Sequence, residues 1–389
     1  MDCLRPLLAC AVAACALILL SVSGASAARQ DHSAKRHTHH HKRHSGKHHR
    51  RRGKQQGRCR KHHAHRGKHH AHQGKRHRHH GKRSCTHKKP TPPAAPPSNQ
   101  LYDPRSPFNT PAPTSGGGSY SQPLAQSSTW ISSLASGGPW TNDPDQYSKP
   151  IYRVDLSASP VRTFQSEGSS FKIYGSGDRS PTTSTCTSCP LHIPDSAAPS
   201  SGSDGHVVLL DPVHGIEEGF WQFSRGSDGT IRFANGYQTH TGAGNMGTFA
   251  DGHAGEGAGI PYLAGTVTKE DVASGSINHA LAAAVTSPGS GFVWPASKSD
   301  GDGGSSSPPE GTRLVLDPSF KESSLSDPIA RMMAHALKVY GVYIVDGSGS
   351  NKFYMEDRTT AGWPASFTRK ATSGIPWSAF RAVAPPAKR

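Results

Sequence analysis

Six consecutive heptads at residues 46–87 constrain the fold of this chain more than any other feature. In frame they read GKHHRRR, GKQQGRC, RKHHAHR, GKHHAHQ, GKRHRHH and GKRSCTH. A coiled coil needs apolar residues at two positions of each heptad, and here those positions hold Lys, His, Arg and Gln. A segment of like charge without an apolar face cannot offset the entropy lost on ordering. We therefore expect a long disordered N-terminal tail over residues 28–89.

This tail carries the charge of the chain. It contains 22 Lys and Arg, one Asp and 18 of the 25 histidines, a charge of +21, so residues 90–389 carry −4 of the whole chain's +17. Such a tail is expected to bind anionic cell-wall polymers through counterion release. Because it lacks aromatic residues for base stacking, nucleic acid should bind only non-specifically. A solubilising spacer that grew by repeat duplication is the alternative.

Clustered imidazoles in the tail also predict metal binding. Neighbouring histidines can chelate nickel, zinc or copper in many registers, which favours several weak, interchangeable sites over one closed site. No cofactor is required by this interpretation. The histidines expected to act as ligands are His39, His40, His41, His62, His63, His65, His69, His70 and His72.

The first 27 residues have the pattern of a secretory signal peptide. Arg5 precedes an apolar run that is too short for a comfortable membrane span, and Ala25-Ser26-Ala27 is an A-x-A cleavage site. We expect an exported monomer that is extracellular or cell-wall associated and has no transmembrane anchor. Four cysteines follow the signal peptide, and they predict two disulfides. One is Cys59–Cys85 in the tail, and the other is Cys186–Cys189, which would close a small loop.

A proline-rich linker at residues 90–100 leads into one globular domain, which we place at residues 101–383 before a short disordered C-terminus, residues 384–389. Short β-rich runs separated by turn residues predict a mainly β fold, sandwich or jelly-roll-like, with two short helices. The expected strands are Ile151–Leu156, Phe171–Tyr174, His206–Asp211, Gly219–Ser224, Thr230–Ala234, Gly291–Trp294, Arg313–Leu316, Val342–Val345 and Phe353–Met355.

Capping signals locate the two helices. Thr268 and Asp271 stand in capping-box relation at the start of Lys269–Val285. Pro328–Tyr340 has Asp327 as its N-cap and an apolar stripe at helical spacing.

Candidate catalytic residues are polar groups at strand ends and helix faces. The five that we expect to converge in one cleft are His206, Glu217, Glu218, His279 and Asp346. Paired carboxylates would serve a glycoside hydrolase, whereas a histidine base would serve a polysaccharide lyase. Asp300-Gly-Asp302 resembles the start of an EF-hand calcium loop. Position 12 of such a loop counted from Asp300 is Gly311 and not the required Glu, so the EF-hand motif is not present.

An ordered set of short motifs resembles a family of exported bacterial proteins common in soil and actinobacterial sequences. The resemblance implies that the domain is a recurring unit to which the basic tail was added, and it assigns no catalytic residue. The motifs are G-I-P-x-L-x-G at Gly259–Gly265, H-A-L at His279–Leu281, V-W-P-A at Val293–Ala296, P-E-G-x-R-L at Pro309–Leu314 and A-L-x-x-Y-G-x-Y-x-V-D at Ala336–Asp346.

These observations together predict an exported protein that binds or cleaves an extracellular polysaccharide and is tethered by its cationic tail. The alternative is a non-enzymatic envelope protein that adheres to anionic polymers and metal ions. Most tryptophans in a domain of this size belong to the core, but some can provide sugar-stacking platforms. The chain has six: Trp130, Trp140, Trp221, Trp294, Trp363 and Trp377.

Overall fold

The computed structural model describes residues 100–112, 114–115, 119–120, 123–166, 170–175 and 182–388. The predicted signal peptide, tail, metal-binding histidines and Cys59–Cys85 pair lie outside these residues. Among the described residues, none of the helices has the length and apolar character needed to cross a membrane.

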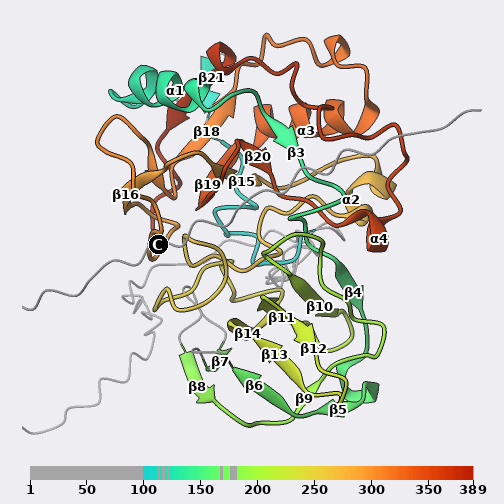
Figure 1. The fold of residues 1–389 in the computed structure, drawn as a ribbon. Helices are drawn as coiled ribbons and strands as arrows, with labels where there is room; N and C mark the ends of the chain where they lie inside the picture. The colour runs from blue at the N-terminus through green and yellow to red at the C-terminus, as the bar shows by residue number, and fades with distance from the viewer. Residues whose placement is uncertain are drawn as a thin grey trace, which may run out of the picture. The chain divides into compact units, whose positions relative to one another are not determined.

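The described chain is built mainly of strands, which confirms the predicted fold class (Figure 1). Two mixed sheets have six strands each. The first has the order β4 (Ile151–Arg153), β10 (Val207–Asp211), β11 (Ile216–Trp221), β14 (Asn235–His240), β7 (Phe171–Tyr174) and β8 (Thr182–Cys186). The second has the order β21 (Phe380–Val383), β18 (Arg313–Leu316), β19 (Val342–Gly347), β15 (Leu281–Val285), β20 (Lys352–Phe353) and β3 (Thr141–Asn142).

Smaller sheets complete the described part of the fold. They are β12 (Ser224–Arg225) with β13 (Ile231–Phe233) and β6 (Phe164–Ser166), β16 (Gly289–Phe292) with β17 (Pro309–Glu310), β5 (Val161–Arg162) with β9 (Leu191–His192), and β1 (Thr114–Ser115) with β2 (Ser119–Tyr120). The described helices are α1 (Ser127–Ser136), α2 (Lys269–Ser274), α3 (Pro328–Val339) and α4 (Arg358–Ala361), with 3-10 turns at Leu156–Ala158, Glu322–Ser324 and Trp377–Ala379.

Central strands of both large sheets, such as β10 and β15, are buried on both faces, whereas the edge strand β8 is largely exposed. In β15, Leu281 and Ala283 pack into the cluster that contains the α1 and α3 side chains, whereas Ala282 and Ala284 face the first sheet. Inward-facing residues of both sheets share one apolar cluster, which includes Val208 of β10. Because side chains alternate along a strand, a strand buried on both faces has a continuous apolar sequence.

This double burial explains where the predicted helix Lys269–Val285 is wrong. The helix begins as predicted, with the Thr268–Asp271 capping box, but α2 ends at Ser274 because Gly275 adopts the left-handed conformation with φ 76°. The following apolar run forms strand β15 instead. A short apolar run does not distinguish a buried strand from a helix by its periodicity. The helix predicted at Pro328 is confirmed, with the Asp327 cap in place.

A second correction concerns Glu217 and Glu218, which precede the predicted strand Gly219–Ser224 and were expected in the turn before it. Strand β11 starts earlier than predicted, at Ile216, because Gly215 with φ 64° closes a tight connection after Asp211. Both glutamates therefore lie within the strand. The structure also confirms the Cys186–Cys189 disulfide, next to the end of β8.

Candidate functional site

A polar pocket opens where segments of both large sheets meet. It consists of two adjoining hollows of about 430 and 280 Å³ that share Asp204, Asp346 and Gly347, and we call them together the central pocket. The first hollow is also lined by Tyr147, Lys352, Tyr354 and Arg369, and the second by His206, Trp221, Asn235, Glu256, Tyr262, Lys298 and Asp300.

An irregularity in the second sheet directs Asp346 toward this pocket. Ala283 pairs with Ile344, but the next residue, Ala284, pairs with Asp346, so Val345 is an extra residue on β19. A bulge of this kind redirects the side chains that follow it and is common beside functional sites. The Asp346 carboxylate accepts a hydrogen bond from the Tyr354 hydroxyl. Burial is the main reason that its pKa lies well above the usual range for Asp.

A buried ion pair supports the floor of the pocket. The Lys149 ammonium pairs with the Glu256 carboxylate, and the two side chains are 0% and 2% exposed. The same ammonium lies 3.2 Å from the centroid of the Tyr354 ring, a cation–π contact. Burial lowers the pKa of Lys149 and raises that of Glu256. The pair fixes the position of the ring whose hydroxyl holds Asp346.

His206 is a neutral imidazole in the wall of the pocket. Its ring packs edge-on against the Tyr262 ring at a centroid distance of 4.9 Å. The side chain is buried, and no described residue provides a hydrogen-bond partner for Nδ1. Burial, followed by the positive charges of Lys149 and Lys352, holds the pKa of His206 well below its usual value. A neutral imidazole has a lone pair that can accept a proton, as a general base must, but the lowered pKa makes His206 a weaker base than an exposed histidine.

The structure brings together two of the five residues that we expected to converge, His206 and Asp346. Glu217 points into the core, where its carboxylate accepts hydrogen bonds from the hydroxyls of Tyr102 and Tyr237. Glu218 lies on the opposite face of β11, and burial raises its pKa to about 8. Neither glutamate lines the central pocket.

His279 lies before β15 and away from the central pocket, in a small separate recess lined by Tyr102 and Thr268. Its Nδ1 contacts the Ala280 carbonyl at 2.9 Å and its Nε2 contacts the Asp271 carboxylate at 3.3 Å. Both partners accept hydrogen bonds, so both ring nitrogens donate and the ring is an imidazolium. This geometry indicates a structural histidine that joins α2 to the start of β15.

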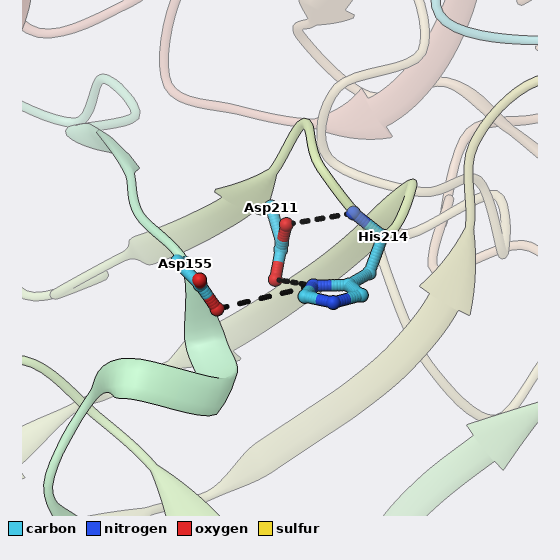
Figure 2. A group of neighbouring side chains, drawn as sticks. All are labelled: Asp155, Asp211 and His214. Atoms are coloured by element: carbon cyan, nitrogen blue, oxygen red, sulfur yellow. Dashed lines mark hydrogen bonds and ion pairs between the residues drawn. The ribbon is translucent and has the colours of Figure 1, made fainter.

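Two groups of side chains in the described residues have spacing suitable for a metal ion. One consists of Asp300, Glu310 and Asp346, beside the central pocket. The other consists of Asp155, Asp211 and His214, shown in Figure 2.

The group in Figure 2 holds two loops together through hydrogen bonds. Asp211 accepts hydrogen bonds from the backbone N–H groups of Leu156, Val213 and His214, each at 2.9 Å. His214 Nδ1 lies 2.8 Å from the same carboxylate and must carry a proton to donate to it. Burial opposes ionisation of Asp211, but these donors lower its pKa to about 2. The Asp211 carboxylate therefore already has four hydrogen-bond donors. It needs no metal ion as a partner, and we assign this group a structural role.

Sequence reasoning missed Lys149, Tyr262, Lys352 and Tyr354 as parts of the site. Lys149 stands before a proline with no motif around it, and Tyr354 occurs in a run that we assigned only as a strand. Trp221 was named among six candidate platforms, and its indole is 37% exposed, whereas Trp140, Trp363 and Trp377 belong to the core.

Comparison of the chain with protein-family models, curated proteins and solved structures found no match.

Proposed function

We propose that this exported protein binds an extracellular polysaccharide in the central pocket and cleaves it by acid–base chemistry. The observation that carries the proposal is the exposed indole of Trp221 in the same pocket as the neutral His206. An exposed aromatic face provides a stacking surface for a sugar ring, and the neighbouring Asp204 and Asn235 offer hydrogen-bond partners for hydroxyl groups.

One cation of the first hollow, Lys352, favours a sugar that carries a carboxylate, although Asp143, Asp204 and Asp346 also line that hollow. The Lys352 ammonium lies over the Tyr147 ring at 5.1 Å, and no described carboxylate lies within 4.0 Å of it. Arg369 lines the same hollow, where it pairs with Asp143 at 3.0 Å. A uronate carboxylate beside Lys352 would gain an ionic partner without displacing one.

Elimination is the reaction that these groups can perform on a uronate. His206 takes the proton on the carbon next to the carboxylate, the electron pair of that bond forms a carbon–carbon double bond, and the glycosidic carbon–oxygen bond breaks. The departing sugar oxygen takes a proton from water. The positive charge of Lys352 stabilises the negative charge that develops on the carboxylate.

Product analysis tests this proposal. The mature protein is incubated with a uronate polysaccharide and with a neutral one. We expect the wild type to produce unsaturated chain ends that absorb ultraviolet light. The His206→Gln variant should lose this absorbance but still bind the polysaccharide. New reducing ends without that absorbance would indicate hydrolysis, and binding without either product would support the adhesion alternative.

The matched control is His279→Gln, which replaces the other buried histidine, outside the pocket. This variant should retain turnover in samples whose circular dichroism shows them to be folded. Loss of turnover in both variants would contradict a specific role for His206.

A further inference from the structure

Three carboxylates from separate segments meet beside the central pocket. Asp300 comes from the loop after β16, Glu310 from β17 and Asp346 from the end of β19. One oxygen of each lies within 4.8 Å of the others. Asp300 and Asp346 line the pocket, whereas Glu310 lies behind them and is 0% exposed.

Glu310 is the member of this group that requires an explanation. Neither of its carboxylate oxygens has a partner of full hydrogen-bond geometry among the described residues, and the polar side chains near it are those of Asp300 and Ser299. Its backbone is fixed, because its carbonyl accepts from Val293 N–H at 2.8 Å and Gly311 N–H donates to Ile344 O at 2.7 Å. Burying a carboxylate without a partner is costly, so the side chain needs either a proton or a cation.

The backbone around the other two carboxylates is arranged to hold their oxygens close together. Gly347 N–H donates to Oδ1 of Asp346 at 3.1 Å and to Oδ1 of Asp300 at 3.2 Å. Gly257 N–H donates to Asp346 Oδ1 at 3.3 Å. A Cβ atom at Gly257 would lie 2.5 and 2.6 Å from these two oxygens, so only glycine allows this approach. These N–H groups hold the carboxyl oxygens of Asp346 and Asp300 close together in front of Glu310.

We propose that Asp300, Glu310 and Asp346 bind a hard divalent cation, with calcium preferred. Calcium takes carboxylate oxygens at about 2.3–2.6 Å, so oxygens on opposite sides of it lie roughly 5 Å apart, a span that the group matches. The ligands are all oxygens, whereas zinc and copper favour nitrogen and sulfur. The cation would partner Glu310, and the open pocket would supply the water ligands that complete its coordination.

Calcium titration of the complete mature chain tests the site without any polysaccharide. The tail does not interfere, because imidazoles bind transition metals and calcium prefers oxygen. We expect one calcium site by calorimetry and a rise in melting temperature on adding calcium. Glu310→Gln should lower the affinity about tenfold or more and abolish the rise in melting temperature, because one of three charged ligands is lost.

Two further variants make the result decisive. Asp300→Asn changes an exposed ligand and so should not affect folding, and it should weaken calcium binding as Glu310→Gln does. Glu218→Gln neutralises another buried carboxylate, outside the group, and should bind calcium as the wild type does. Absence of calcium uptake by the wild type at millimolar concentration, or equal affinity in Glu310→Gln and Glu218→Gln, would overturn the proposal. Either failure leaves the polysaccharide proposal standing, since turnover is measured separately.

Discussion

Lys149 and Glu256 form an ion pair that is closed off from solvent, with side-chain exposures of 0% and 2%. Lys149 immediately precedes Pro150 and β4, and Glu256 belongs to the glycine-rich loop that lines the central pocket, so the pair joins two distant segments. Each charge has lost its hydration and depends on the other. The Tyr354 ring adds a further contact to the ammonium.

Removing one partner of this pair should be strongly destabilising. In Lys149→Met, the Glu256 carboxylate is left buried without its cation, and we expect the free energy of unfolding to fall by about 3–5 kcal/mol. Urea unfolding followed by tryptophan fluorescence measures the change.

A partly exposed pair provides the control. Lys338 and Glu322 lie 3.1 Å apart with side chains 17% and 30% exposed, and Lys338→Ala should cost about 1 kcal/mol or less. The double variant Lys149→Met, Glu256→Leu should recover part of the loss, because no charge then remains unpaired. Equal effects of Lys149→Met and Lys338→Ala would mean that the buried pair is not formed.

Protonation of His206 should destabilise the domain at acid pH. Its folded-state pKa is lowered by burial and by Lys149 and Lys352, with Asp204, Glu256 and Tyr262 as the other titratable groups of that wall. The unfolded state takes up a proton near pH 6.5, so the stability that depends on neutral His206 is present above about pH 6.5 and is lost as the pH falls below it. In urea unfolding experiments between about pH 8 and about pH 5, the free energy of unfolding of His206→Gln should fall less at acid pH than that of the wild type.

His279 should show the opposite dependence. Burial alone would lower its pKa, but the Asp271 carboxylate and the Ala280 carbonyl raise it above the usual value. Its contribution to stability is therefore complete below about pH 6.5 and is lost as the pH rises through the folded-state pKa. His279→Gln should cost more at about pH 5 than at about pH 8. The same sign of pH dependence in both variants would contradict the two protonation states assigned here.

Local signals allowed much of the fold to be predicted, whereas the site depends on contacts that no local signal reports. Strand Arg313–Leu316 and the Asp327 cap follow from propensity and capping, and both are correct. His206 and Asp346 lie close together because the start of β10 and the end of β19 meet at one pocket. We expected this only from the general position of binding residues in loops at strand ends. Its exact form depends on the β19 bulge, which nothing in the sequence marks.

Errors in the predicted set have the same origin. Glu217 and Glu218 are neighbours in sequence, but side chains alternate along a strand, so they face different cores once β11 includes them. We expected His279 to lie on a helix, but α2 ends before Gly275, so His279 lies outside it. Lys149 pairs with Glu256, which lies more than a hundred residues away in the sequence. The periodicity of apolar residues gives no information about such a distant contact.

Truncation of Trp221 should weaken polysaccharide binding without affecting folding. The indole is 37% exposed, and losing its contact with a sugar ring should cost about 1.5–3 kcal/mol, or roughly 10- to 150-fold in affinity. Quenching of fluorescence is unsuitable for the Trp221→Ala variant, so affinity electrophoresis in a polysaccharide gel is the measurement. Phe292→Ala is the control, because Phe292 is 52% exposed and outside the central pocket. Equal retardation of Trp221→Ala and the wild type would exclude stacking at this position.

The basic tail should bind polyanions in a manner that salt reverses and acid strengthens. Residues 28–89 carry a charge of +21 and contain 18 histidines. Because the reference pKa of a histidine side chain is about 6.5, acidification should add positive charge to the tail. On a heparin column, the mature protein should elute at higher salt than a chain that starts at Pro90, because more counterions are released. The difference should increase at mildly acidic pH.

Replacing the 18 tail histidines by glutamine separates the two sources of charge. This variant keeps all 22 Lys and Arg of the tail, so it should still bind heparin at neutral pH but lose the gain at acid pH. Its calorimetric titration with nickel should also lose the weak heat that we expect from the imidazole clusters. Equal elution of the mature protein and the chain from Pro90 would show that the tail does not contribute to polyanion binding, and the pocket alone would then have to account for any retention.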